Sequence, residues 1–209
     1  GWPETARAGG ALVDPMCGSG TLPIEAALLA GDVAPGLLGH RFGFEGWLGH
    51  VPALWRRLLE EAGERRDAGL KTLPPILGSD RDPRAVRLAR RNLERAGLCG
   101  LVHIEQRELA EAAPPEGGKP GLLLVNPPYG ERLGEREELG GLYREWGQVL
   151  RQRFAGWRAG LFTGSPPLAR GLRLKPEQSF DLYNGALECR LFMYRVAVER
   201  FVQQRGKGR

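Results

Sequence analysis

The strongest local indication of the fold is the stretch Asp14-Pro15-Met16-Cys17-Gly18-Ser19-Gly20-Thr21. It follows a short apolar run at residues 11–13 and precedes the apolar segment 22–30, which ends at Gly31. An apolar run, a glycine-bearing loop and an apolar segment in this order predict a strand, a tight turn and a helix. Glycines let the backbone approach a ligand closely, and a helix N-terminus offers unpaired N–H donors. We therefore expect a ligand site at residues 14–21.

The same alternation continues along the chain. Asp82-Pro83 begins a predicted helix that runs to Gly97, and a second helix is expected around residues 142–150. The expected strands are residues 11–13, 76–79, 101–104, 121–125 and 159–163, and two strands within 180–198 joined at Asn184-Gly185. Repeated β-α-β units predict an α/β protein with a Rossmann-like, mostly parallel, doubly wound sheet of seven strands and helices on both faces. The ligand site then lies at the carboxyl ends of the strands.

One segment interrupts this alternation. Residues 32–75 combine Phe42, Phe44 and Trp47, among glycines, with a predicted amphipathic helix. We interpret the segment as an insertion within one domain, residues 1–202, and expect its aromatic side chains to hold it against the core. Residues 203–209 are expected to be a disordered basic tail.

Composition limits the class of protein. The net charge of +5 on 209 residues is compatible with a polyanionic partner but modest for one. Three cysteines without CxxC spacing argue against disulfides and against a zinc site, so no metal is expected, and a cytoplasmic location fits best. No apolar run approaches the roughly 20 residues of a membrane span, so no membrane partner is expected. The chain begins Gly1-Trp2, and we expect it to be part of a longer protein.

The glycine loop favours one class of cofactor. It is neither GxGxxG nor GK[ST], so it indicates neither a dinucleotide nor a P-loop phosphate. The acidic residue Asp14, at the end of the first strand, suits a ligand with an ammonium group, as in the methionine part of S-adenosylmethionine (SAM). The loop alone also fits a tight turn without a ligand. Asp80 ends the second strand, where a carboxylate can accept both hydroxyls of a ribose; alternatively, it is a turn residue beside Asp82.

Asn126-Pro127-Pro128-Tyr129 carries the most specific signal. The tetrapeptide follows the apolar strand 121–125 and therefore lies at the expected ligand site. Two prolines stiffen the backbone and remove two donors. The Asn126 amide oxygen and the Pro127 carbonyl can then both accept hydrogen bonds from one –NH2 group, and Tyr129 offers a face for stacking. The alternative is a proline turn after a buried strand.

These motifs together are typical of class I SAM-dependent amino-methyltransferases. The segments DPMCGSGTLPIEAALLA (14–30), APGLLGHRFGFEGW (34–47), GSDRDP (78–83), NPPYGERLG (126–134) and YNGALECRLFMY (183–194) resemble the bacterial 23S rRNA guanine-N2 methyltransferases. The resemblance covers nearly the whole chain. In that family an RNA-binding THUMP domain precedes the catalytic domain, and no such domain is present in these 209 residues.

The resemblance implies a role for individual residues. The loop at Asp14, Cys17, Gly18, Ser19, Gly20 and Thr21 would hold the methionine part of SAM, and Asp80, with Arg81 beside it, the ribose. Glu108 replaces the family's usual aspartate near the adenine amine. Residues 126–129 would bind the target base, with Asn126 also close to the cofactor. The expected substrate is a guanine N2 amine in 23S rRNA, as a precursor or within an assembling subunit.

Other interpretations stay open at this point. A related THUMP enzyme would methylate guanine N2 in tRNA, and other NPPY enzymes act on adenine N6 or on protein glutamine. A SAM-binding scaffold without activity is a further alternative. Arg84, Arg87, Arg91 and Arg95 share one helix face and are interpreted as solvated rather than as phosphate contacts. Cys17 is interpreted as a small loop residue rather than a nucleophile, because no base accompanies it.

Overall fold

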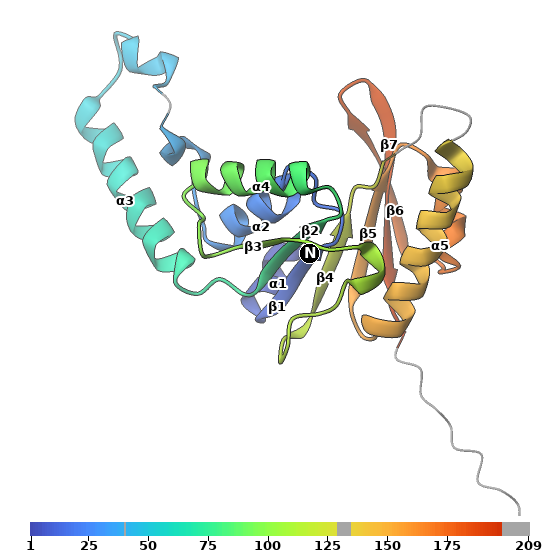
Figure 1. Ribbon diagram of the computed structural model, residues 1–209. Coiled ribbons are helices and arrows are strands. Elements are labelled where there is room, and N and C mark those ends of the chain that lie inside the picture. Colours follow the sequence, from blue (N-terminus) through green and yellow to red (C-terminus); the bar gives the residue numbers. More distant parts are fainter. Residues whose placement is uncertain (40, 129–134, 198–209) are drawn as a thin grey trace, which may run out of the picture.

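The computed structural model describes residues 1–39, 41–128 and 135–197 (Figure 1). Seven strands form one sheet in the order β3-β2-β1-β4-β5-β7-β6. The strands are β1 (Gly10–Asp14), β2 (Ile76–Asp80), β3 (His103–Gln106), β4 (Lys119–Val125), β5 (Arg158–Thr163), β6 (Gln178–Asn184) and β7 (Leu187–Arg195). The neighbouring pairs among β1 to β5 are all parallel, whereas β7 is antiparallel to both β5 and β6. The predicted α/β fold is confirmed.

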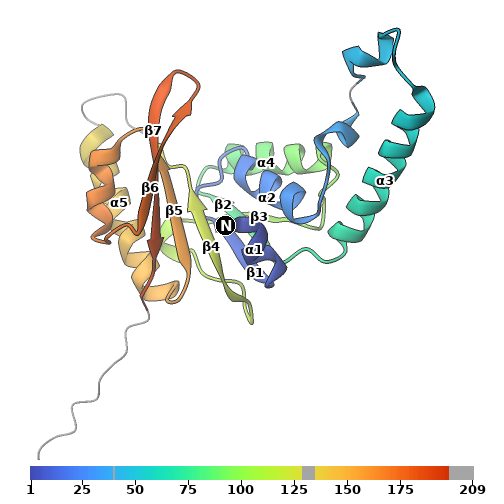
Figure 2. The ribbon, with the colours of Figure 1, turned by 180° about the vertical axis from the view of Figure 1, so that it is seen from behind.

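Helices cover both faces of this sheet, as Figures 1 and 2 show. The helices α1 (Trp2–Arg7), α2 (Thr21–Ala30) and α4 (Pro83–Arg95) lie on one face. The other face carries α5 (Glu135–Arg153) with the short 3-10 helices η3 (Leu109–Glu111) and η4 (Pro166–Leu172). Alternation along β1 separates two cores, because Leu12 packs with the first group of helices and Val13 with the second. No helix in the described residues is long and apolar enough to cross a membrane.

The insertion forms an arm rather than a packed layer. It contains the 3-10 helices η1 (Pro35–Leu38) and η2 (Gly43–Gly46) and the long helix α3 (Pro52–Leu70), which leans away from the sheet (Figures 1 and 2). No residue of α3 is buried. Close contact occurs at its base, where a Cβ on Gly69 would meet the carbonyl oxygen of Gly31 at 2.2 Å.

The prediction that the aromatic residues hold the insertion against the core is wrong. Phe42 and Phe44 stack on each other with ring centroids 5.4 Å apart. Trp55 of α3 meets both rings edge-on, at 5.6 and 5.0 Å. Trp47 is 72% exposed. The aromatic residues therefore satisfy one another within the arm, because Trp55 supplies a closer apolar partner than the sheet does.

We expect Trp55→Ala to increase local opening of the arm without destabilising the sheet and the helices that cover it. The substitution removes two edge-to-face contacts, each worth about 0.5–1.5 kcal/mol. Amide hydrogen exchange should rise by roughly ten-fold in residues 41–58, while the unfolding temperature changes by less than about 4 °C. Trp47→Ala is the matched control and should change neither quantity. Slower or unchanged exchange in Trp55→Ala would show that the aromatic cluster does not order the arm.

Candidate active site

The carboxyl ends of β1, β2 and β4 meet at one edge of the sheet and surround a cavity of about 320 Å³. Six of the predicted site residues line this cavity: Gly18, Asp80, Arg81, Glu108, Asn126 and Pro128. The volume lies within the roughly 300–1,000 Å³ typical of sites for small ligands. We call this space the cofactor cavity.

The glycine loop shapes one wall of the cavity. Gly18 and Gly20 have φ values of 54° and 82°, which side chains other than glycine rarely adopt. Gly20 is the N-cap of α2, and a Cβ there would lie 3.0 Å from the Cβ of Ala89 on α4. The Asn92 side-chain amide donates to the Ser19 carbonyl at 2.9 Å, and the hydroxyls of Ser19 and Thr21 lie 3.1 Å apart. Contacts with α4 thus fix the loop, and the backbone of Gly18 lines the cavity.

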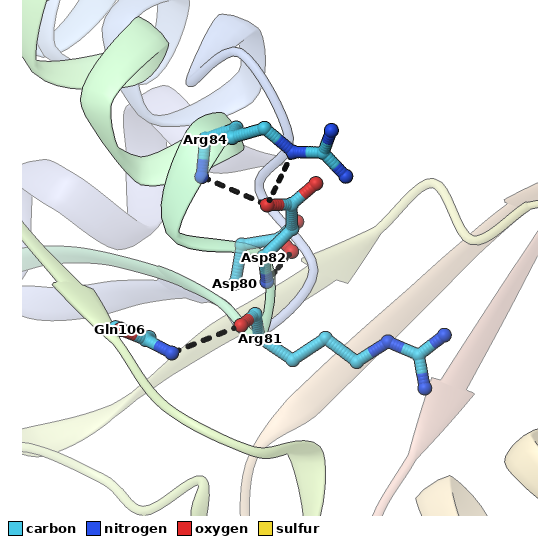
Figure 3. A network of polar contacts seen from close by, with 5 residues as sticks. All are labelled: Asp80, Arg81, Asp82, Arg84 and Gln106. Carbon is cyan, nitrogen blue, oxygen red and sulfur yellow. Dashed lines mark hydrogen bonds and ion pairs between the residues drawn. The ribbon is translucent and has the colours of Figure 1, made fainter.

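Asp80 joins the glycine loop to the end of β2. The Gly18 N–H donates to its Oδ2 at 2.9 Å, and the Asp82 N–H donates to its Oδ1 at 2.9 Å. Each carboxylate oxygen has a second acceptor position, so the group can still accept hydroxyl groups from a ligand. Figure 3 shows Arg81 extending away from Asp82 and Arg84, while its carbonyl accepts from Gln106 Nε2 at 3.2 Å. Asp80 is therefore both a loop anchor and a cavity wall.

Asp14 and Cys17 lie beneath the cavity rather than in its lining. Asp14 is 1% exposed and accepts from the Met16 N–H at 3.1 Å. Burial, with a smaller contribution from the Asp80 carboxylate, raises the pKa of Asp14 to about 8. Burial and the carboxylates of Asp14 and Asp80 also raise the pKa of the Cys17 thiol. A neutral, buried thiol agrees with the interpretation of Cys17 as a loop residue.

The raised pKa of Asp14 makes the stability of the ligand-free chain depend on pH. The folded state binds this proton more tightly than the unfolded chain, so the stabilisation is complete below about pH 4 and is lost as pH rises to about 8. The pKa values of Asp32 and Asp82 are lowered by Arg65 and by the Arg84 N–H respectively, so their contributions are complete above pH 4 and do not mask this trend.

We therefore expect the unfolding temperature to fall by several degrees between pH 5 and pH 8, since 1 kcal/mol corresponds to about 2–4 °C. Asp14→Asn, which cannot ionise, should show a flatter profile. Scanning calorimetry at fixed ionic strength measures the difference between the two chains. Parallel profiles would exclude titration of Asp14 as the cause.

The Asn126-Pro127-Pro128 segment closes the cavity from the end of β4. Asn126 and Pro128 are exposed and line the cavity, whereas Pro127 is buried. Asn126 and Pro128 therefore line the same cavity as the residues expected to hold the cofactor. Tyr129 lies outside the described residues.

Five residues of the cavity were not predicted: Pro15, Met16, Leu109, Leu142 and Glu145. Pro15 and Met16 belong to the glycine loop itself. Leu109 is 6% exposed and follows Glu108 after β3, so an apolar residue next to the predicted acidic contact was the available signal. Leu142 and Glu145 lie three residues apart on α5, and only the packing of α5 brings them to the cavity. In the ranges that the structure describes, no group of three or more His, Cys, Asp or Glu residues could hold a metal ion.

This sheet order, with one antiparallel strand next to the edge and a cavity at the strand ends, defines a Rossmann-like methyltransferase fold. The chain belongs to the family described as "RMKL-like, methyltransferase domain", which it matches over residues 5–192. The family relationship expected from the sequence is confirmed.

Relatives and solved structures agree with this assignment. The chain is 54% identical over 202 residues to "Ribosomal RNA large subunit methyltransferase K/L" of Allochromatium vinosum, and 54% identical over 205 residues to the protein of the same name from Methylococcus capsulatus. These alignments cover 97% and 98% of the chain, which spans 28% of the length of either relative. The crystal structure of SMU.472, named a methyltransferase and complexed with SAH, matches with a TM-score of 0.81 at 33% identity, covering 91% of this chain and 49% of the other.

Proposed function

We propose that this chain binds SAM and transfers its methyl group to the N2 amine of a guanine in 23S ribosomal RNA. One observation carries the proposal: a single cavity brings Gly18, Asp80 and Glu108 together with Asn126 and Pro128. The similarity to proteins named ribosomal RNA large subunit methyltransferases supports the choice of substrate. The activity is expected in the cytoplasm, on an RNA precursor or an assembling subunit.

The residues of the cavity fit SAM, which supplies an electrophilic methyl group when bound. Gly18 presents backbone without a side chain, and no described neighbour would lie within 4 Å of a Cβ at this position. The free acceptor positions of Asp80 suit the two ribose hydroxyls, with Arg81 beside them. Glu108 suits the adenine amine, and the buried Leu109 offers an apolar surface for the adenine ring. Asp14 lies beneath this lining, and its buried carboxylate is proposed to attract the ammonium group, because a nearby cation favours its ionised form.

The target amine needs alignment more than a base. The lone pair of guanine N2 is delocalised into the ring, and the carboxylates among the described lining residues, Asp80, Glu108 and Glu145, are weak bases for so weakly acidic an amine. The Asn126 side-chain oxygen and the Pro127 carbonyl are proposed to accept hydrogen bonds from the two N–H groups of this amine. Both interactions strengthen as positive charge develops on nitrogen. Tyr129 is proposed to stack on a base that has been extruded from the RNA.

Binding of S-adenosylhomocysteine (SAH) to the chain alone tests the cofactor part of the proposal. Calorimetry should show binding at one site per chain. Gly18→Val should weaken that binding by at least roughly ten-fold, because a branched side chain at positive φ is strained and projects into the cavity. Gly100→Val is the matched control: its φ is also positive, 77°, but it lies in a turn away from the cavity. Equal affinities in the two variants would argue against binding at the glycine loop.

The remaining parts of the longer relatives are proposed to position the RNA. A net charge of +5 implies weak, salt-sensitive RNA binding by these 209 residues alone. An upstream THUMP domain is proposed to raise the effective concentration of RNA at the methyl donor.

A further inference from the structure

A second, larger cavity lies beside the proposed methylation site. It has a volume of about 560 Å³ and lies between Gly164, at the end of β5, and the β6–β7 hairpin. We call it the hairpin cavity. Val125 of β4 pairs with Leu161 of β5, so Pro128 and Gly164 each lie three residues beyond a matched pair. Adjacent strands are roughly 4.8 Å apart. Pro128 and Gly164 therefore follow neighbouring strands at the same end of the sheet, and the hairpin cavity lies on the side of the residues that are proposed to hold the target base.

The hairpin presents two pairs of side chains on this side. Tyr183 lies directly opposite Glu188, and Asp181 lies opposite Arg190. Alternate residues of a strand share a face, so all four side chains project from the same face of the hairpin, and all four line the cavity. A two-residue turn containing Gly185, with φ 61°, connects the strands and fixes their register. Figure 1 shows the hairpin rising beyond its neighbours in the sheet.

The chemistry of these four residues is specific. Arg190 Nε lies 2.6 Å from Asp181 Oδ1, so this arginine and this carboxylate neutralise each other. Glu188 is exposed and has no ion-pair partner among the described residues. The Tyr183 side chain is 69% exposed. The cavity thus offers an aromatic face next to a carboxylate that is free to accept two parallel hydrogen bonds.

A planar ligand with two adjacent N–H donors fits this pair of groups. Among the RNA bases, guanine carries such donors on its Watson–Crick edge, at N1 and N2. Adenine, cytosine and uracil lack two adjacent donors there. A free phosphate does not fit, because the uncompensated charge among the described lining residues, that of Glu188, is negative. A base stacked on Tyr183 with its edge at Glu188 satisfies both groups.

An adjoining cavity contains an arginine that could contact the phosphate of such a nucleotide. It has a volume of about 320 Å³, shares Pro166 and Arg190 with the hairpin cavity, and is also lined by Arg170. Arg170 is exposed and has no ion-pair partner in the part of the chain that the structure describes. Glu188, which would accept from the base, and Arg170, which would contact the phosphate, therefore line different cavities.

We propose that the hairpin cavity binds a second guanine of the RNA substrate, close in the RNA to the guanine that is methylated. Tyr183 stacks on this base, Glu188 accepts from its N1–H and N2–H, and Arg170 contacts its phosphate. This inference rests on the proposed function, which supplies the RNA. It makes Tyr183 and Glu188 specificity-determining residues that leave the methyl-transfer step itself unchanged.

Binding of mononucleotides to the SAH-saturated chain tests the proposal. The probes are GMP, IMP, which lacks the N2 amine, and AMP. They are titrated into the Asn126→Ala variant so that the target-base site does not contribute, and the NMR shifts of the Gly164 and Gly185 amides report on the cavity. We expect GMP to bind more tightly than IMP, and IMP more tightly than AMP. Tyr183→Ala should weaken GMP binding by roughly 5- to 150-fold, the range for one stacked base. Tyr183→Phe should retain it.

Two further variants separate recognition from stability. Glu188→Gln should abolish the preference for GMP over IMP, because an amide cannot accept two parallel hydrogen bonds. Phe180→Ala removes an exposed aromatic residue from the opposite face of the same strand and should leave GMP binding unchanged. GMP binding that is insensitive to both Tyr183→Ala and Glu188→Gln would overturn the proposal. Tighter binding of N-acetylarginine amide than of GMP, measured by displacement of GMP, would also overturn it. That result would assign the cavity to an arginine side chain of a protein.

Failure of the proposed function gives a different result. If the chain does not bind SAH or yields no N2-methylguanosine, the proposed function is wrong. The order of the GMP, IMP and AMP affinities still tests the hairpin cavity. With RNA as substrate, Tyr183→Ala and Glu188→Gln should raise KM for RNA and leave kcat within about two-fold. Loss of kcat with KM unchanged would place these residues in the reaction itself and contradict a recognition role.

Discussion

Replacing Asn126 by alanine should reduce kcat for methyl transfer by about 10²–10³, the range observed when one preorganised electrostatic contact is lost. The side-chain oxygen is proposed to accept from the target amine and to bind more strongly as positive charge develops on nitrogen. Asn126 is exposed at the end of β4, so its loss should cost little folding stability. SAH affinity should stay within about two-fold, because the glycine loop and Asp80 are intact.

Single-turnover methylation of RNA measures this effect without contributions from product release. Asn126→Asp is the informative companion variant, since it retains an acceptor oxygen and should keep more activity than Asn126→Ala. Full activity in Asn126→Ala would remove Asn126 from the mechanism. A large loss of SAH affinity would instead place its main role in cofactor binding.

Asp80→Ala should weaken SAH binding by roughly ten- to hundred-fold, since hydrogen bonds to a charged acceptor are worth about 1.5–3 kcal/mol. The same carboxylate accepts from the Gly18 and Asp82 N–H groups at 2.9 Å, so its removal also releases the glycine loop. Both effects act in the same direction on affinity. The unfolding temperature is expected to fall as well, because two backbone donors lose their partner.

Asp82→Ala provides the matched control for this second prediction. The Asp82 carboxylate accepts from the Arg84 N–H at 2.8 Å and caps α4. Its loss should cost about 1 kcal/mol of stability without changing SAH affinity. Calorimetric titration of both variants therefore separates cofactor binding from general destabilisation. Unchanged affinity in Asp80→Ala would exclude the ribose assignment.

The sheet could be predicted from sequence because each strand carries its own local signal. The apolar run 76–79 became β2 (Ile76–Asp80), and the Asn184-Gly185 turn joined two strands as expected. The third strand was placed two residues too early. Gly100, with φ 77°, continues the turn, and Leu101 is 39% exposed. An apolar residue within a turn is indistinguishable from a strand residue until its exposure is known.

Features that depend on tertiary contacts could not be predicted. Helix α1 is only six residues long, and it is held by Trp2, whose indole Nε1–H donates to the Ala26 carbonyl at 2.8 Å. The cavity residues Leu142 and Glu145 reach the site through the packing of α5. The burial of Asp14 beneath the loop could likewise not be predicted from the sequence motif. Asp80 and Asn126 were predictable because sheet topology brings the carboxyl ends of parallel strands together, whereas Glu108 was expected only from the family resemblance.

Nucleoside analysis of methylated RNA tests whether the chain transfers a methyl group to guanine N2. The 209-residue chain and the full-length relative from Allochromatium vinosum would each be incubated with SAM and unmodified 23S rRNA, which is then digested and analysed by mass spectrometry. We expect N2-methylguanosine from both proteins, with the lower yield from the shorter chain. N6-methyladenosine in the RNA, or methylated glutamine in an added protein, in place of N2-methylguanosine would contradict it.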